Sequence, residues 1–323
     1  MKLHKFIQRI CAATVASALT LSLCTPVLAE GIAALPAPTS GTSQPDETGD
    51  VPIDPAHFPD ENFRKYLGQK AIDDDKNGIL SQTEREKVTA IVLHSAGNIS
   101  DLTGIKYFPN LKELYCNGGD LANLDVSQNT KLTNLYCYNN QLTSLDVSEN
   151  TKLTELDCSD NQLANLDVSE NPELTYLKCG SNQLTRLDLH VNTALETLIC
   201  DNNQLTSLNL SSNTALTQVY CSGNKRQITV GETGQFDLSA LKGFDVSKAS
   251  GWSEGATVDG NILTVPYGVT EISYRYDLDL GNRKRETFTL TFDKVEEPDL
   301  PDDSSAPADT GSTAGGAIAA VAV

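Results

Sequence analysis

The sequence predicts a β-solenoid with a helical cap before it and a small β domain after it, an α+β chain in which the solenoid dominates. Three observations support this fold class: a fixed period of 21 residues in the middle of the chain, an acidic twelve-residue loop before it, and short alternating strands after it. A period of about 20–29 residues with apolar residues at fixed offsets is typical of stacked supersecondary units. We therefore expect a stack of near-identical rungs.

Six cysteines set the period, each 21 residues after the last. They are Cys116, Cys137, Cys158, Cys179, Cys200 and Cys221. In the second repeat Leu135 and Cys137 are two residues apart, so both side chains point to one side of a short strand, the interior. The leucines at constant offsets make this a leucine-rich repeat pattern. Residues 88–93 have the spacing of a degenerate leading rung, so the solenoid is predicted over 88–225.

Two columns of asparagine repeat with the same period. The first contains Asn140, Asn161, Asn182, Asn203 and Asn224, and the second contains Asn129, Asn150, Asn171, Asn192 and Asn213. We expect a first-column asparagine to bond the backbone of its own turn and of the next rung. The segment between the columns, residues 142–148, is predicted to form a second strand or an extended edge.

The cysteines of the repeat are predicted to be buried free thiols. Adjacent rungs lie roughly 4.8 Å apart with parallel side chains, a geometry that does not readily give the torsion angle of a disulfide. Cysteine packs well as a small core residue. No histidine recurs with the ladder, so a catalytic or metal-binding role is not expected of it.

The N-terminus has the features of a secretory signal peptide over residues 1–29. Lys2, Lys5 and Arg9 form the positive region, residues 10–23 form the apolar region, and Val27-x-Ala29 is a small-residue cleavage site. The apolar run is too short for a membrane-spanning helix. We expect a secreted, extracellular protein with no membrane insertion after the signal is removed.

The rest of the chain divides by composition. Residues 30–50 are predicted to be a linker, 51–87 a helical cap, 226–296 a small β-sandwich of immunoglobulin-like type, and 297–323 an acidic stalk rich in Pro and Ser. The formal net charge is −19, and such a surface repels the phosphates of nucleic acid, so no nucleic-acid partner is expected.

The tail from Ala308 to Ser312 resembles the start of a sortase cell-wall sorting signal, with a Thr-Gly pair ahead of a small apolar run. Pro307 lies one place earlier than in the usual signal, and no basic residue follows the apolar run. Attachment to the cell wall and an accidental match are therefore both open.

Residues 73–84 match the EF-hand calcium loop. The expected ligands are Asp73, Asp75, Asn77, the carbonyl of Ile79, Ser81 through water, and Glu84. Ser81-x-x-Glu84 is also a helix capping box, but a capping box does not explain the two upstream acids. Most calcium sensors pair two hands, whereas this chain has one. The calcium ion is therefore expected to stiffen the cap, with an affinity of roughly 10⁻⁴–10⁻³ M.

Strand residues that flank the buried leucine and cysteine are expected to face outward, on the concave side of the solenoid. The predicted partner-binding set is Tyr115, Tyr136, Tyr138, Glu155, Asp157, Tyr176, Lys178, Asp201 and Tyr220, with Glu113 among them. Tyrosine is a common interface anchor, and exposed aromatic clusters mark contact sites. In the alternative reading these side chains only keep the face soluble.

A further column of acids lies on the second segment of the rungs. Its members are Asp125, Asp146, Asp167 and Asp188. Such acids more often cap turns or stay solvated than hold a ladder of cations.

An EF-hand-like cap, a short-period leucine-rich solenoid and an immunoglobulin-like domain together resemble the internalin-type surface proteins of Gram-positive bacteria, over residues 51–296. The 21-residue period with cysteine departs from the 22-residue, leucine-based repeat usual there. The resemblance implies a secreted or wall-attached protein whose concave face binds a protein partner, often on a host cell.

Two other functions stay open: a carbohydrate-binding surface module, in which the same rings stack on sugar, and a passive spacer. An enzyme is not expected. His57, His94 and His190 are scattered, and no nucleophile–base motif accompanies them.

Overall fold

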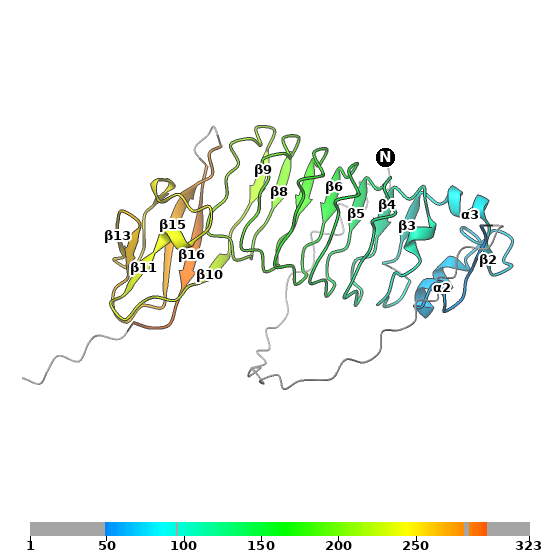
Figure 1. Ribbon diagram of the computed structural model, residues 1–323, viewed down its shortest axis with the longest axis horizontal. Helices are drawn as coiled ribbons and strands as arrows, with labels where there is room; N and C mark the ends of the chain where they lie inside the picture. Colours follow the sequence, from blue (N-terminus) through cyan, green and yellow to red (C-terminus); the bar gives the residue numbers. More distant parts are fainter. Residues whose placement is uncertain (1–48, 95, 281–283, 296–323) are drawn as a thin grey trace, which may run out of the picture. The chain divides into compact units, whose positions relative to one another are not determined.

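The computed structural model describes residues 49–94, 96–280 and 284–295, most of them in three consecutive regions (Figure 1). The predicted signal peptide, nearly all of the linker and the stalk with its sorting-like motif lie outside the described residues. Within the described part, no helix is both long and apolar enough to cross a bilayer.

The first region is a cap of two short helices, α2 (Glu61–Leu67) and α3 (Gln82–Lys87), and one antiparallel pair of strands, β1 (Val51–Pro52) and β2 (Ile79–Leu80). Asp60 caps α2 by accepting a hydrogen bond from the backbone of Phe63, which satisfies a free N–H of the first turn. The core side chains of the cap, which include Phe58, Phe63 and Leu80, are fully buried.

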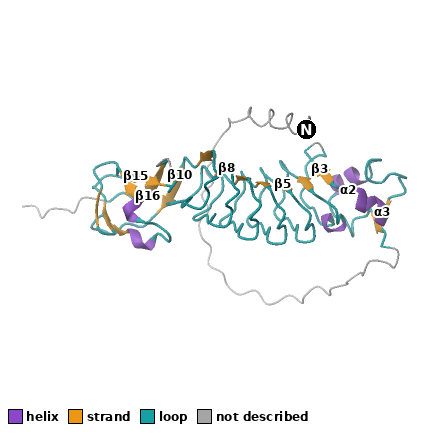
Figure 2. Cartoon of the chain, turned by 90° about the horizontal axis from the view of Figure 1, so that it is seen from above, coloured by secondary structure: helices purple, strands orange, loops and turns teal. Residues whose placement is uncertain are grey.

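The second region is a solenoid with one short strand per rung, joined in a seven-stranded parallel sheet. The strands are β3 (Ala90–Val92), β4 (Glu113–Tyr115), β5 (Asn134–Tyr136), β6 (Glu155–Asp157), β7 (Tyr176–Lys178), β8 (Thr197–Ile199) and β9 (Gln218–Tyr220). A short 3₁₀ helix, η1 (Ile105–Tyr107), follows the leading rung. In every strand the middle residue is buried, as the alternation of side chains predicts. Figure 2 shows that most of each rung outside the strand is loop.

The first asparagine column joins neighbouring rungs. Asn161 Nδ2 donates to the carbonyls of Cys137 and Cys158, and its Oδ1 accepts from the backbone N–H of Leu142. Cys137 and Leu142 lie on the preceding rung, so the expectation that this column bonds the next rung was wrong. The direction follows from the chain path, because the asparagine amide reaches the turn stacked before it.

The second segment of the rungs, residues 142–148 and its equivalents, forms no strand in the described part of the solenoid. It keeps an extended course in which Leu142, Leu145 and Val147 are buried. Asp146 accepts a hydrogen bond from the backbone N–H of Ser148 at 2.9 Å, and the equivalent acids do the same. These aspartates therefore close turns. Of the two predicted forms of the second segment, a strand or an extended edge, the structure has the extended edge.

The six cysteines of the repeat are free and buried. Burial raises the pKa of Cys116 to about 12, and burial is also the main cause of the raised pKa of Cys158. The thiols therefore serve as small core side chains between the leucines, as the spacing indicates.

The third region contains two small sheets. The larger has the order β10 (Asn224–Gln227), β16 (Arg285–Thr291), β15 (Glu271–Asp277), β12 (Ala249–Ser250). The smaller joins β11 (Gln235–Asp237), β14 (Ile262–Thr264) and β13 (Thr257–Asp259) in that order, and two 3₁₀ helices, η2 (Leu238–Ala240) and η3 (Val246–Lys248), lie between strands. The pairing of β10 with β16 is parallel, whereas the other pairs of this region are antiparallel. The immunoglobulin-like assignment stays a prediction.

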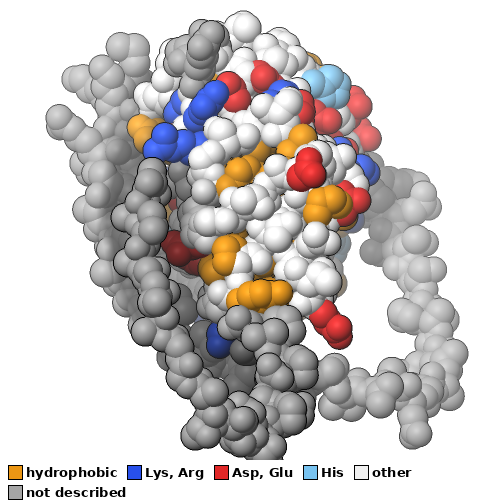
Figure 3. Space-filling view, turned by 90° about the vertical axis from the view of Figure 1, so that its left-hand side faces the viewer, with side chains coloured by type: hydrophobic (Ala, Val, Ile, Leu, Met, Phe, Trp, Pro, Cys, Tyr) orange, Lys and Arg blue, Asp and Glu red, His pale blue; other side chains and the backbone are white. Residues whose placement is uncertain are grey.

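Aromatic side chains fill the core of this region. Tyr274 and Phe288 are buried, and Trp252 stacks on Tyr274 with ring centroids 4.6 Å apart. Figure 3, which looks at this end of the molecule, shows hydrophobic side chains as small separate spots among polar ones. The visible surface of the β domain therefore offers no broad apolar patch to a partner.

The β domain is bonded to the last rungs. The hydroxyl of Tyr274 donates to the carbonyl of Thr206 at 2.6 Å, and the backbone N–H of Leu210 donates to the carbonyl of Leu278 at 3.0 Å. Asn224 belongs both to β10 and to the first asparagine column. The predicted boundary at residues 225 and 226 therefore falls inside a strand that the two regions share.

Candidate metal site and binding face

The acidic loop of the cap brings three carboxylates together. Asp73, Asp75 and Glu84 each place one oxygen within 4.8 Å of the others. Asp73 is only 2% exposed. Glu84 is also buried, whereas Asp75 is exposed. Carboxylates held this close repel one another, so the arrangement favours a bound cation.

Local hydrogen bonds shape this loop. Gly78 takes a positive φ of 78°, and its N–H donates to Asp73 Oδ2 at 3.0 Å. The backbone N–H of Asn77 donates to Asp75 Oδ1 at 3.0 Å, and that of Ile79 donates to Asn77 Oδ1 at 2.7 Å. Ile79 lies in β2 opposite Pro52, so the strand pair fixes the second half of the loop.

Glu84 closes the loop and also takes part in the capping box of α3. Its Oε2 accepts from the hydroxyl of Ser81 at 2.7 Å and from the backbone of Ser81 at 2.9 Å, and its Oε1 accepts from the backbone of Asp74 at 2.8 Å. Burial acts to raise the pKa of Glu84, but these hydrogen bonds outweigh it and leave the pKa below its usual value. Glu84 is therefore ionised at neutral pH, as a metal ligand must be.

One atom of the loop has no partner. Asp73 Oδ1 is buried and accepts no hydrogen bond among the described residues. An unpaired buried carboxylate oxygen is costly, and the capping box does not satisfy it. The loop contains four acids and one lysine, and all its ligand candidates offer oxygen, the donor that Ca²⁺ prefers. The residues present therefore fit a calcium ion.

The predicted concave side is the outer side of the seven-stranded sheet, here called the strand face. On it the rings of Tyr115 and Tyr136 stack with centroids 4.8 Å apart and planes 11° apart. The hydroxyl of Tyr136 donates to Glu155 on the next strand. Burial is the first cause that raises the pKa of Tyr115 to about 12, and the charge of Glu113 adds to it. These four residues form the first cluster of the strand face.

A second cluster lies beside it. Lys178 Nζ is 5.6 Å from the ring centroid of Tyr138 and 3.5 Å from Asp157 Oδ2. Asp157 Oδ1 accepts from the hydroxyl of Ser159 at 2.6 Å. Burial raises the pKa of Asp157 although the lysine and the serine act against it. The structure thus joins an aromatic ring, a cation and a carboxylate across adjacent rungs.

The predicted face residues differ in exposure. Tyr115 and Asp157 are 8% and 4% exposed, whereas Tyr136, Tyr138, Tyr176 and Asp201 are partly buried. Tyr220 on β9 is 55% exposed, and among the described residues it makes no ring contact with the other tyrosines. Ser159 was not predicted to take part in this face, although an acid followed two residues later by serine is a known turn pattern.

Residues 130–171 match the family model described as Leucine Rich repeats, in two copies. The solenoid is a leucine-rich repeat solenoid. A search of curated proteins gives no match.

Among solved structures, this leucine-rich repeat chain is similar to internalin C2 of Listeria monocytogenes, with 21% identity, 54% of this chain and 88% of that one covered, and a TM-score of 0.42. It is also similar to the functional domain of InlJ from the same organism, described as including a cysteine ladder, with 17% identity, 75% and 98% covered, and a TM-score of 0.24.

A third similar structure is a leucine-rich repeat protein of Leptospira interrogans, with 27% identity, 40% and 35% covered, and a TM-score of 0.37. Two of these three proteins are internalins, the family that the sequence resembles. Because all three TM-scores lie below 0.5, the assignment rests on the family model and on the repeats themselves.

Proposed function

We propose that this chain is a non-enzymatic binding protein, secreted or attached to the bacterial cell wall, that holds a protein partner on its strand face. The supporting observation is the pair of adjoining clusters around Tyr136 and Lys178, which place aromatic rings and charges side by side on adjacent strands. Leucine-rich repeat solenoids offer long faces of this kind and usually work by binding.

The strand face is ordered before it meets a partner. The inner strands β4 to β8 are each bonded to both neighbours in register, and the tyrosines of the two clusters are held by neighbouring side chains, for example Tyr136 by Glu155. A partner therefore meets rings that have already lost much of their rotamer freedom, which lowers the entropic cost of association. Tyrosine also contributes strongly to interfaces, because the ring packs and the hydroxyl bonds.

The charge of the face and of the whole chain favours a partner with a basic surface. Glu113, Glu155, Asp157 and Asp201 lie on the face beside a single lysine of the predicted set, Lys178, in a chain of net charge −19. Opposite charge steers association and suppresses the wrong partners more than it adds affinity. We expect the association rate to fall as salt increases.

The direct test is to screen residues 30–311 against arrays of host cell-surface proteins and of glycans. The test variant changes Tyr136, Tyr138 and Tyr176 to Ser. The control variant, Tyr267→Ser, removes an exposed tyrosine of the β domain. A protein that binds the unchanged chain and the control but loses at least about tenfold in affinity for the test variant supports the proposal. A hit unchanged in the test variant contradicts the strand face as the site.

Two alternatives are separated by the same screen. Binding to a glycan, lost in the test variant, would favour a carbohydrate-binding surface module, because tyrosine rings also stack on sugars. Absence of any hit on either array would favour a passive spacer.

The second part of the proposal is that one calcium ion completes the cap, held by Asp73, Asp75, Asn77, Ile79 and Glu84, with Ser81 acting through water. The unpartnered Asp73 Oδ1 is the observation that supports it. The ion would neutralise the converging carboxylates and fix the loop. A calcium titration followed by calorimetry should give one site with a dissociation constant on the order of 10⁻⁴–10⁻³ M.

Glu84→Gln should weaken calcium binding strongly, because the closing carboxylate is lost. Glu86→Gln on the same helix is the matched control and should bind as the unchanged chain does. Equal loss in both variants, or no calcium heat in the unchanged chain, would contradict the proposal.

Secretion rests on the predicted signal peptide. N-terminal sequencing of the protein released by the bacterium should begin at residue 30, and a chain that keeps Met1 would contradict the proposal.

A further inference from the structure

One rung of the solenoid departs from the repeat at two positions of its second segment. Arg186 stands where the neighbouring rungs have Asn165 and Ser207, and His190 stands where they have Ser169 and Ser211. In a stack of near-identical rungs, scaffold positions carry the common residue. The charge of Arg186 is therefore not required by the repeat itself. Both departures lie on the same side of the same rung.

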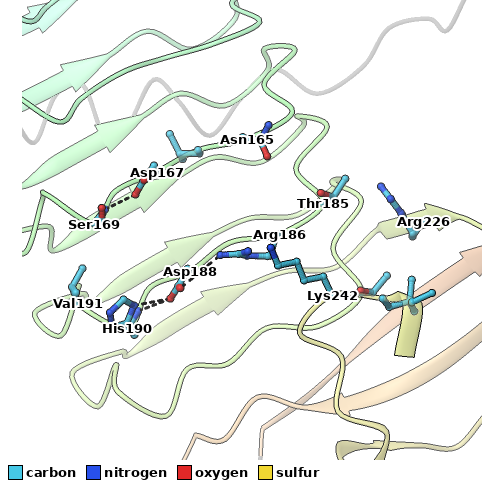
Figure 4. A pocket seen from close by; sticks show the side chains of 14 residues that line it. Asn165, Asp167, Ser169, Thr185, Arg186, Asp188, His190, Val191, Arg226 and Lys242 are labelled. Atoms are coloured by element: carbon cyan, nitrogen blue, oxygen red, sulfur yellow. Dashed lines mark hydrogen bonds and ion pairs between the residues drawn. The ribbon is translucent and has the colours of Figure 1, made fainter. Parts of the chain in front are cut away.

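Arg186 and His190 line the same hollow, here called the flank cleft, with a volume of about 560 Å³. Its far wall is formed by Arg226 on β10 and by Lys242, which follows η2 in the β domain. Figure 4 shows Arg186, Asp188 and His190 in a row along one rung, with Arg226 and Lys242 on the elements facing them. A volume of this size falls in the range of small-ligand sites, roughly 300–1,000 Å³.

The wall from the β domain is fixed to the solenoid. The hydroxyl of Ser207 donates to the carbonyl of Gly243 at 3.2 Å, next to Lys242, and Leu241 is buried. Arg226 Nη1 donates to Gln204 Oε1 at 3.2 Å. Both walls are therefore held by contacts between the rungs and the β domain.

The charge of the cleft is opposite to that of the chain. The three cations Arg186, Arg226 and Lys242 face two acids, Asp167 and Asp188, whereas the chain carries a net charge of −19. Cations gathered in a hollow of an acidic protein attract an anion to that hollow.

Arg186 and Lys242 make only weak ion pairs, or none, with the described residues around them. Arg186 lies 3.9 Å from Asp188 Oδ2, which is long for an ion pair, while His190 Nδ1 is 2.9 Å from Asp188 Oδ1. Lys242 makes no ion pair with any described residue. Arg186 and Lys242 can therefore turn to a ligand without breaking a strong bond.

We propose that the flank cleft binds an acidic sugar residue, a ring that carries one carboxylate and several hydroxyls. Arg186 and Lys242 would receive the carboxylate, and Asn165, Thr185 and Asp167 would bond the hydroxyls. Asp167 and Asp188 oppose a more highly charged ligand such as a phosphate dianion. The lining includes no Phe, Tyr or Trp side chain and most of its side chains are polar or charged, which disfavours an apolar ligand.

The test uses glucuronate and glucose as probes, with binding followed by ligand-observed NMR on the full secreted chain. The test variant is Arg186→Ser with His190→Ser, which places at both exposed positions the serine that the following rung has, Ser207 and Ser211. We expect the unchanged chain to bind glucuronate at least about tenfold more tightly than glucose, and the variant to lose that preference. Lys242→Ser should weaken glucuronate binding in the same direction.

The control is Lys152→Ser, which removes one positive charge from an exposed position of another rung. It should bind glucuronate as the unchanged chain does. Equal affinity for glucose and glucuronate, no detectable binding, or a preference that survives in the Arg186→Ser and His190→Ser variant would overturn the proposal. The strand-face tyrosines are not part of this cleft, so failure here leaves the proposed partner site untouched.

Discussion

The rungs of the solenoid and the cap before them complete their buried polar groups in different ways. In the rungs, Asn161 bonds two carbonyls and one N–H, and the same bonds recur at Asn140 and Asn182. In the cap, Asp73 Oδ1 is buried without a partner among the described residues. The first asparagine column therefore finds its partners within the repeat, whereas the cap leaves an oxygen for which we propose a calcium ion.

The second asparagine column refines this contrast. Asn171 Nδ2 donates to the carbonyls of Val147 and Asn150, but its Oδ1 has no partner among the described residues. A neutral amide oxygen without a bond costs less than a carboxylate oxygen in the same position. The solenoid can therefore tolerate a column of unpaired amide oxygens, whereas a single unpaired carboxylate oxygen in the cap is costly.

The largest effect is expected from Asn161→Ala. The change leaves the buried N–H of Leu142 without its acceptor and removes one of two asparagine donors from the carbonyls of Cys137 and Cys158. We therefore expect a loss of about 3 kcal/mol in the free energy of unfolding. Urea unfolding followed by circular dichroism measures it. The control is Asn165→Ala, exposed on the same rung, which should change stability by less than about 0.5 kcal/mol. Equal losses would mean that the first column is not what holds the rungs.

Calcium should have the next largest effect. With a dissociation constant of roughly 10⁻⁴–10⁻³ M, 10 mM calcium should stabilise the chain by about 1.4–2.7 kcal/mol. Thermal unfolding with calcium and with chelator measures the shift, and magnesium at the same concentration controls for ionic strength. An equal shift with both ions would argue against a calcium-selective loop.

Asn171→Ala should cost less than Asn161→Ala, about 1–2 kcal/mol. It also removes two bonds to buried carbonyls, but it leaves no N–H without an acceptor and removes an amide oxygen that had no partner. The same urea experiment compares the two variants. A larger loss for Asn171→Ala would reverse the proposed difference between the columns.

The smallest effect on stability concerns the thiols. Because burial raises the pKa of Cys116 to about 12, this thiol is protonated in the fold at a pH where the unfolded chain has begun to lose its proton. Ionisation then favours the unfolded state, so stability should fall as pH rises above about 9. At pH 8 the ladder thiols should react with a disulfide reagent only after unfolding, and rapid reaction of the native protein would contradict their burial.

Much of the solenoid could be predicted from the sequence, because the period repeats. Leu135, Cys137 and their equivalents were assigned to the interior correctly, since alternation along a strand leaves only two choices. The bonding direction of Asn161 could not be predicted, because it depends on which turn stacks on which. The conformation of residues 142–148 could not be predicted uniquely, because apolar alternation alone does not distinguish a strand from an extended edge.

The candidate sites show the same limit. The acids of residues 73–84 are close in sequence, so their convergence could be predicted from the loop alone. The flank cleft could not, because Arg186 and Lys242 belong to different regions and meet only through contacts between the β domain and the rungs. The sequence shows that His190 takes the place of the rung serine, which predicts only a solvated surface residue. That it lines a cleft with Arg186 and Lys242 depends on the fold.

Hydrogen exchange of residues 30–323, measured with calcium and with chelator, tests the contrast between cap and rungs most directly. We expect calcium to slow exchange in the cap and leading rung, residues 51–92, and to leave residues 155–221 unchanged, because all the proposed calcium ligands lie in the cap. No change in the cap, or an equal change along the whole solenoid, would contradict it.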